Sequence, residues 1–357
     1  MKIVKIGGTK TVMSNPGSLH SYFAWPTAAR LQNGQIAVVA SGFRRRHVCP
    51  FGKTVISYSA DEGESYTPPA PVIDTVLDDR DGGILPFGEN NVIVTSFNNT
   101  VDFQRRSAKS SYDLAYLELI TPQQEENALG ATFRISNDGG VTFGPVHKSP
   151  VTSPHGPTQL SDGTLLWVGR TFSAENTRRQ DDCIKAYQIR PDGSMTHVGT
   201  IENIQVQDIA AFSCEPHAIV LESGRVLAHI RVQAEGLFTI YQTESDDNGR
   251  TWTKPVPVLP ALGGSPPHLL RHSSGMLICT YGYRKAPFGI KAMFSRDGGK
   301  TWDAGHDLYI NHISADLGYP STVEMKDGSL LTVFYAHPEQ GGPAVIMQQK
   351  WSFEDEI

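Results

Sequence analysis

The stretch Ser295-Arg296-Asp297-Gly298-Gly299-Lys300-Thr301-Trp302 is one of four copies of the same turn, and the others begin at Ser59, Ser136 and Ser245. Each copy spaces Ser, Asp, Gly, a hydroxyl residue and an aromatic residue identically. In such a turn the aspartate can accept backbone N–H bonds, the glycine supplies a positive φ, and the aromatic ring packs on a neighbour. We therefore expect these aspartates to hold hairpin turns rather than to act in catalysis or metal binding.

A second pattern, in which a glycine-containing turn joins two short apolar strands, occurs six times. Its glycines are Gly34, Gly88, Gly163, Gly224, Gly275 and Gly328. A spacing of roughly 50 residues is the size of a propeller blade of four strands. The sequence therefore predicts an all-β fold: one domain over residues 1–357, a six-bladed β-propeller with four-stranded antiparallel blades and almost no helix.

The two ends of the chain and one insertion complete this prediction. The sixth unit ends at Trp351-Ser352-Phe353, one strand short of a blade. We expect the N-terminal stretch 2–6 to supply that strand and close the ring, which removes exposed sheet edges. The second unit carries an insertion at about 100–131. There Thr121-Pro122-Gln123-Gln124 is a typical helix start, so we expect one short helix in this loop, ended by Gly130.

Composition and charge exclude several classes of protein. The chain has 31 basic and 37 acidic residues and a formal net charge of −6, which does not favour nucleic acid as a partner. No apolar run is long enough for a membrane span, and the N-terminus lacks the apolar stretch of a signal peptide. These features favour a cytoplasmic location. A periplasmic or secreted protein whose signal peptide had been removed would have the same sequence.

The four cysteines, Cys49, Cys183, Cys214 and Cys279, lie far apart and form no CxxC pair. Zinc sites use closely spaced cysteine pairs, and free cysteine prefers protein interiors. We expect four free, buried thiols and no metal site.

Four such turns on six blades resemble the Asp-box turns (BNR repeats) of the sialidase (neuraminidase) superfamily, and the resemblance covers nearly the whole chain. The resemblance implies an exo-acting glycoside hydrolase whose nucleophile is a tyrosine activated by a glutamate. Tyr319, in Asp316-Leu317-Gly318-Tyr319, is similar to that nucleophile, and Glu215, in Cys214-Glu215-Pro216-His217, is similar to its base. A phenol with a pKa of about 10 needs such a base before it can attack.

The resemblance also implies three arginines that clamp a substrate carboxylate, a role that suits the planar guanidinium. Arg231 is similar to the second of them, and Arg284, in Tyr281-Gly282-Tyr283-Arg284, is similar to the third. Tyr283, next to Arg284, is also expected to contact the substrate. The first is missing: Ala24-Trp25-Pro26 stands where the family has Arg-Ile-Pro, so Trp25 takes the place of the Ile or of the Arg, depending on the offset. Arg44, Arg45 or Arg46 could replace that arginine from the adjacent loop, or this loop is simply a solvated basic segment.

The acid/base aspartate of the family is expected in the loop 43–53, which contains no carboxylate. His47 of this loop could transfer the proton instead, since its side chain titrates near neutral pH. Asp81, at the start of the second unit, is the other candidate.

The first strands of the six units converge on the ring axis, so polar residues near their starts are expected to form one cleft. Such a concentration of ionisable groups indicates a binding site. The residues at or near these positions are Trp25, Asp81, His155, Arg170, Glu215, His217, Arg231, His268, Arg284 and Tyr319. Three histidines would also allow a metal centre, but different blades hold them apart, so we expect neither a metal nor a cofactor.

The sequence therefore predicts hydrolysis of a terminal acidic sugar of a glycan, sialic acid or a related sugar acid. Two alternatives stay open. The missing arginine and aspartate favour a catalytically inactive carbohydrate-binding propeller. Histidine and tyrosine beside an arginine-neutralised carboxylate would also suit a lyase that acts on uronic-acid polysaccharide.

Overall fold

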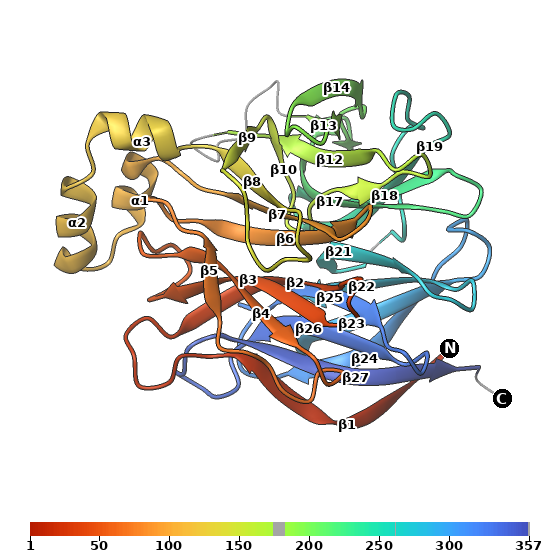
Figure 1. The fold of residues 1–357 in the computed structure, drawn as a ribbon. Helices are drawn as coiled ribbons and strands as arrows, with labels where there is room; N and C mark the ends of the chain where they lie inside the picture. Colours follow the sequence, from red (N-terminus) through yellow and green to blue (C-terminus); the bar gives the residue numbers. More distant parts are fainter. Residues whose placement is uncertain (174–182, 261, 356–357) are drawn as a thin grey trace.

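The computed structural model describes residues 1–173, 183–260 and 262–355. Six antiparallel sheets surround a common axis as the blades of a β-propeller (Figure 1). The first three blades comprise, in order, β2(Tyr22–Arg30), β3(Ile36–Arg44), β4(Lys53–Ser59) and β5(Ala70–Ile73); β6(Arg80–Phe87), β7(Asn91–Phe97), β8(Ala131–Ser136) and β9(His147–Ser149); and β10(Val151–Thr152), β11(Thr158–Gln159), β12(Leu165–Thr171), β13(Ile184–Ile189) and β14(Met195–Thr200).

The other three blades follow the same plan. They comprise β17(Phe212–Val220), β18(Val226–Ala234), β19(Leu237–Ser245) and β20(Val256–Pro257); β21(Gly264–Arg271), β22(Leu277–Tyr283), β23(Phe288–Ser295) and β24(Asp303–Asn311); and β25(Gly318–Glu324), β26(Leu330–Ala336), β27(Val345–Glu354) and β1(Lys2–Met13). A small hairpin of β15(Gln205–Val206) and β16(Ile209–Ala210) precedes the fourth blade. The predicted fold class is therefore confirmed.

The third blade departs from the four-strand plan. Its inner strand is divided into β10 and β11, which both pair with β12. The interruption contains Pro154 and Pro157, and proline has no N–H to give to a sheet ladder. This break allows His155 to leave the strand register.

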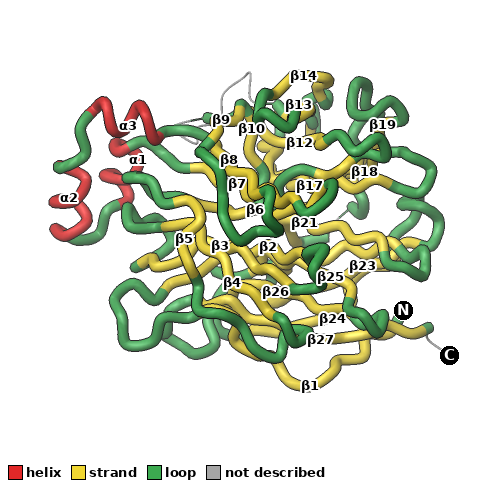
Figure 2. The backbone as a smooth tube through the Cα atoms, in the orientation of Figure 1, coloured by secondary structure: helices red, strands yellow, loops and turns green. Residues whose placement is uncertain are grey.

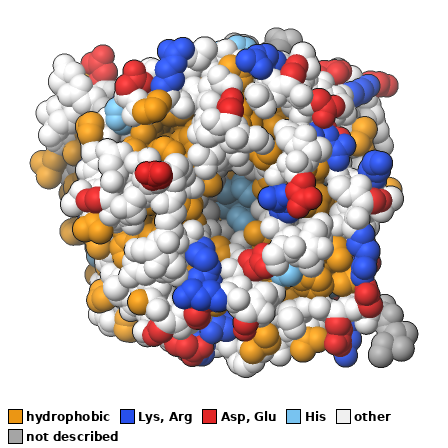
Figure 3. Space-filling model, turned by 45° about the vertical axis from the view of Figure 1, so that its right-hand side comes forward, with side chains coloured by type: hydrophobic (Ala, Val, Ile, Leu, Met, Phe, Trp, Pro, Cys, Tyr) orange, Lys and Arg blue, Asp and Glu red, His pale blue; other side chains and the backbone are white. Residues whose placement is uncertain are grey.

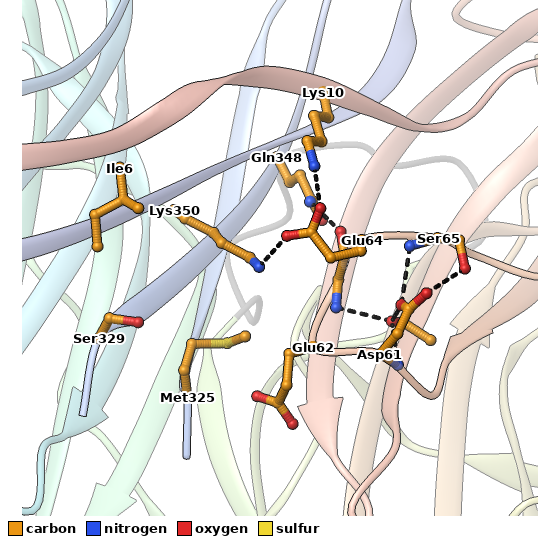
Figure 4. Close-up of polar contacts among 12 residues, drawn as sticks. Ile6, Lys10, Asp61, Glu62, Glu64, Ser65, Met325, Ser329, Gln348 and Lys350 are labelled. Atoms are coloured by element: carbon orange, nitrogen blue, oxygen red, sulfur yellow. Dashed lines mark hydrogen bonds and ion pairs between the residues drawn. The ribbon is translucent and has the colours of Figure 1, made fainter. Parts of the chain in front are cut away.

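The ring closes as the sequence predicted. β1 pairs with β27 in antiparallel register, from Lys2 opposite Glu354 onward. At the junction of the sixth and first blades, Glu64 contacts Lys10 of β1 and Lys350 of β27, and Gln348 Nε2 donates to the carbonyl of Gly63 at 2.6 Å (Figure 4). Closure leaves the blade sheets packed against one another around the ring.

The four repeated turns are built as expected. In the copy that follows β23, Asp297 accepts from the Thr301 amide at 2.9 Å and from the Thr301 hydroxyl at 2.6 Å. These hydrogen bonds lower the pKa of Asp297 to about 2. Trp302 Nε1 donates to Gln242 of the preceding blade at 2.9 Å, so the turn also joins two blades. Each aspartate serves its own turn.

The insertion in the second blade contains three helices rather than one: α1(Val101–Ser107), α2(Ser111–Glu118) and α3(Pro122–Ala128), which cluster on one side of the ring (Figure 2). α3 has the expected capping box of Thr121 and Gln124 and ends two residues before Gly130. α1 and α2 were not predicted. Thr100 and Ser110 cap them, and both accept a hydrogen bond from a backbone amide in the first turn.

Candidate functional site

Five of the six inner strands carry the same β-bulge near their start: those of the first, second, fourth, fifth and sixth blades. In four of these bulges the first extra residue is Trp25, Asp81, Glu215 or Tyr319, with φ of 55°, 49°, 49° and 48°. A positive φ is unfavourable for a residue with a side chain, and such strain concentrates at functional sites. A bulge re-aims its side chain, and all four line the same cavity at the ring axis.

The cavity has a volume of about 330 Å³. Its lining contains both ionisable and aromatic side chains. Its lining includes Trp25, His47, Arg80, Asp81, Phe97, Phe103, Arg170, Phe172, Phe212, Glu215, Arg231, Arg284 and Tyr319. A concave site of this size with a few convergent polar groups is typical of a site for a small molecule.

Tyr319, Glu215 and Arg231 form a hydrogen-bonded group across the fourth and sixth blades. The Tyr319 hydroxyl donates to Glu215 Oε1 at 2.7 Å. Arg231 Nη1 donates to Glu215 Oε2 at 2.6 Å and to the Tyr319 oxygen at 3.2 Å. The carboxylate can therefore accept the phenolic proton, while the guanidinium stabilises negative charge on both oxygens.

Burial and the Glu215 charge raise the pKa of Tyr319 well above 10, although Arg231 opposes this shift. The phenol is therefore neutral at rest. A neutral phenol can act as a nucleophile only if a base takes its proton, and Glu215 is within hydrogen-bond distance for that role.

Asp81 is buried in the same cavity, and burial raises the pKa of its carboxyl to about 7, partly offset by Arg80. Its Oδ1 has no hydrogen-bond partner among the described residues. A carboxyl group with this pKa can donate a proton at neutral pH and take one back later.

His47 lies at the rim of the cavity, and 55% of its side chain is exposed. Its ring meets the Trp25 indole edge-on, with centroids 4.9 Å apart, and its Nδ1 is 3.6 Å from Asp316. Asp316 already accepts hydrogen bonds from Tyr22 at 2.9 Å and Tyr335 at 3.0 Å. The structure thus places Asp81 inside the cavity and His47 at its opening.

Residues 114–333 match the model of the BNR repeat-like domain family. The chain belongs to this family. A protein of unknown function from Dyadobacter fermentans is 19% identical over 99% of both chains, with a TM-score of 0.78. The NanB sialidase of Streptococcus pneumoniae is 11% identical over 97% of this chain and 70% of that chain, with a TM-score of 0.69. No curated protein matches the sequence.

A third similar structure is the α-L-arabinanase of Penicillium chrysogenum, 12% identical over 98% of both chains, with a TM-score of 0.64. At these identities the likeness extends to the fold. Together with the family match, it confirms the sialidase-type propeller expected from the repeated turns.

The cavity wall contains four arginines: Arg80, Arg170, Arg231 and Arg284. The guanidinium of Arg284 makes no hydrogen bond or ion pair to any residue the structure describes, and its carbon lies 5.8 Å from the centroid of Phe238. Arg231 lies over the same ring at 5.0 Å. Arg231 and Arg284 thus share Phe238 as a neighbour and both line the cavity, and Arg284 has donors left for an anion.

Arg44 is not available to a ligand, contrary to one expectation from the sequence. Its side chain is fully buried, pairs with Asp78 at 2.6 Å and donates to the His47 carbonyl at 2.7 Å. Its guanidinium carbon lies 4.8 Å from the centroid of Trp25, so it supports the indole from inside the protein. Arg45 and Arg46 instead pair with Asp113 of α2.

An Arg44→Met variant should be strongly destabilised, because Asp78 would keep a buried charge without its close partner. Breaking a buried pair in this way costs about 3–5 kcal/mol of unfolding free energy. Chemical denaturation measures the loss. Lys2→Met, which breaks an exposed pair with Glu354, is the control and should change little. A loss below about 1 kcal/mol for Arg44→Met would show that Asp78 is satisfied in another way.

His155, His217, His268 and Tyr283 do not line the cavity. The expectation that different blades hold the three histidines apart is wrong, because their ring centroids lie 4.5–5.2 Å from one another in a separate cluster. Tyr283 lies under Lys291, with the ammonium 4.6 Å from its ring centroid. The position of an inner-strand residue along the strand, and not only its blade, decides whether it reaches the cavity.

Several cavity residues were missed by the sequence analysis: Arg80, Phe97, Phe103, Phe172 and Phe212. Phe103 comes from α1, which was itself not predicted. Arg80 directly precedes Asp81, and its guanidinium carbon lies 4.3 Å from the centroid of Trp25. Its position directly before Asp81, a residue already expected at the site, was the one available signal in the sequence.

Within the described part of the chain, no group of three His, Cys, Asp or Glu side chains is arranged to hold a metal ion. No described helix is long and apolar enough to cross a membrane. Cys49, Cys214 and Cys279 are free and buried as expected, whereas Cys183 is half-buried.

Proposed function

We propose that the protein is an exo-acting glycoside hydrolase that cleaves a terminal acidic sugar from a glycan, with Tyr319 as the nucleophile. The observation that carries the proposal is the 2.7 Å hydrogen bond from the Tyr319 hydroxyl to Glu215 inside the axial cavity. The fold is also that of solved sialidases and an arabinanase, which supports glycosidase chemistry as a class.

In the first step, Tyr319 Oη attacks the anomeric carbon while Glu215 takes the phenolic proton. The glycosidic C–O bond breaks, and the Asp81 carboxylic acid gives its proton to the departing oxygen. The product is a sugar bonded to Tyr319, with Glu215 protonated and Asp81 ionised. A tyrosine nucleophile is a known exception to the two-carboxylate pattern of glycosidases.

In the second step, water attacks the anomeric carbon and Asp81 takes its proton. The C–O bond to Tyr319 breaks, and the phenolate recovers its proton from Glu215. Asp81 ends as the acid again, so the site is restored and one water has been consumed. The same group acts as acid and then as base, which requires a pKa near the working pH.

The acidic character of the sugar follows from the arginines. Arg231 and Arg284 both line the cavity and both lie near the ring of Phe238, and a carboxylate matches the paired donors of a guanidinium. The phenylalanines of the cavity lining favour an apolar face or substituent on the same sugar.

Replacing Arg284 by Met should lower kcat/KM for an acidic glycoside by about 10- to 100-fold, because one hydrogen bond to a charged group is worth about 1.5–3 kcal/mol. The loss should disappear with the methyl ester of the same sugar, which has no carboxylate. Lys285→Met, at the exposed neighbouring position, serves as the matched control and should change neither value. An equal loss of kcat/KM on both substrates would show that Arg284 does not recognise the carboxylate.

The direct test is a screen of aryl glycosides and acidic glycans with mass spectrometry of the products. Hydrolysis adds the mass of water to the cleaved fragments, and this is the expected result. An unsaturated sugar without added water would instead establish a lyase. Saturable binding without any product would establish a carbohydrate-binding propeller.

A further inference from the structure

Three histidines from three blades meet on the propeller axis, outside the proposed catalytic cavity. His155, His217 and His268 are 2%, 8% and 7% exposed. Their ring centroids form a triangle with sides of 5.2, 4.9 and 4.5 Å. The face of the molecule shown in Figure 3 has a hollow near its centre, and histidine side chains form the floor of that hollow. The proposed mechanism uses none of the three.

The Nδ1 atoms of His217 and His268 are both occupied by backbone amides. Leu269 N–H donates to His217 Nδ1 at 2.8 Å, and Thr322 N–H donates to His268 Nδ1 at 3.3 Å. Burial lowers the pKa of His217 to about 3 and that of His268 well below 6.5, so both rings are neutral at pH 7. A neutral ring whose Nδ1 accepts must carry its proton on Nε2.

His155 has the opposite tautomer. Its Nδ1 is 3.0 Å from the Thr27 hydroxyl, and that hydroxyl donates its only proton to the Pro154 carbonyl at 3.0 Å. The hydroxyl oxygen must therefore accept from Nδ1–H of His155. Burial also lowers the pKa of His155 well below 6.5. Its Nε2 is consequently an acceptor, and this buried atom has no partner among the described residues.

We propose that these three Nε2 atoms hold one water molecule on the propeller axis. Two N–H donors, from His217 and His268, and one acceptor, on His155, match the two lone pairs and one hydrogen of a water. A buried water typically makes about three hydrogen bonds to groups that lack other partners. Its second hydrogen is free to point along the axis.

The same tautomers exclude the other small guests of a three-histidine cluster. A metal ion needs a lone pair from every ligand, but His217 and His268 direct N–H groups from Nε2. Freeing those lone pairs would break two hydrogen bonds to backbone amides. A chloride ion would be repelled by the lone pair of the neutral His155.

The test is solution NMR of the untagged full-length chain labelled with 15N at histidine, at pH 7. Long-range 1H–15N correlations report which ring nitrogen carries the proton, and single His→Gln variants assign the signals. We expect Nε2–H for His217 and His268 and Nδ1–H for His155. Rotating-frame Overhauser spectra should show direct cross-peaks from both Nε2–H protons to water.

His229 is the internal control, because it is fully buried and its Nε2 is bonded to Gln242 at 3.0 Å; its Nε2–H should show no such cross-peak. If neither Nε2–H proton shows a cross-peak to water, the water site is wrong. Adding two equivalents of Zn²⁺ should leave the NMR signals of the three rings unchanged. A shift of the signals of all three rings, or zinc retained through dialysis, would show that the site holds a metal ion and not a water.

Discussion

A Tyr319→Phe variant should lose turnover by at least about three orders of magnitude while remaining folded. Removing the nucleophile of a covalent mechanism removes the bond that the transition state forms, so the loss should be in kcat rather than in KM. The ring of Phe fills nearly the same volume, and among the described residues the lost hydroxyl makes hydrogen bonds only with Glu215 and Arg231. Steady-state kinetics on the substrate found by the screen measures the effect.

Tyr283→Phe is the matched control for this substitution, because Tyr283 lies outside the cavity and should keep nearly full activity. Melting curves of both variants establish that the fold is retained. If Tyr319→Phe keeps more than about a tenth of the wild-type kcat, the deficit is under about 1.4 kcal/mol. Tyr319 would then not be the nucleophile, and the site would have to be rebuilt around Asp81 and His47.

The second large effect is expected for Asp81→Asn, which removes the proton donor and acceptor but keeps the shape of the side chain. Losing general acid–base catalysis should lower kcat/KM by about 10²- to 10⁴-fold on a substrate with a poor leaving group. On an aryl glycoside the rate of the first step should fall much less, because that leaving group departs without a proton.

The pH profile separates Asp81 from His47. The first step needs Asp81 protonated, and burial raises its pKa to about 7, so kcat/KM should fall as the pH rises above about 7. Asp81→Asn should abolish this alkaline limb, whereas His47→Gln should keep it. The reverse pattern would assign the proton transfer to His47.

The fold could be read from the sequence because its repeats are local. Each repeated turn is stabilised by hydrogen bonds within a few residues, as between Asp297 and Thr301, so its residues are visible as a motif. The strand supplied by the N-terminus was found by counting strands in the sixth unit. The helices α1 and α2 were missed because each is at most eight residues long. Their capping residues, Thr100 and Ser110, were the only sequence signals of a helix start.

The candidate site was only partly predictable. Trp25, Asp81, Glu215 and Tyr319 were found because a strand start recurs in every blade, but no motif shows that a bulge turns these residues into one cavity. His217 is only two residues beyond Glu215, yet it belongs to the axial cluster and not to the cavity lining. The burial of Arg44 depends on Asp78, a partner distant in sequence.

Trapping the covalent intermediate would show whether Tyr319 forms a bond to the sugar. The probe is a deoxyfluoro glycosyl fluoride of the acidic sugar. Its anomeric fluorine is a good leaving group, and the second fluorine, which stays on the sugar ring, slows hydrolysis of the covalent adduct. Mass spectrometry of the intact chain should show one added sugar, and peptide mapping should place it on Tyr319. An adduct on any other residue, or hydrolysis of the natural substrate by wild-type enzyme with no adduct formed, would contradict the mechanism.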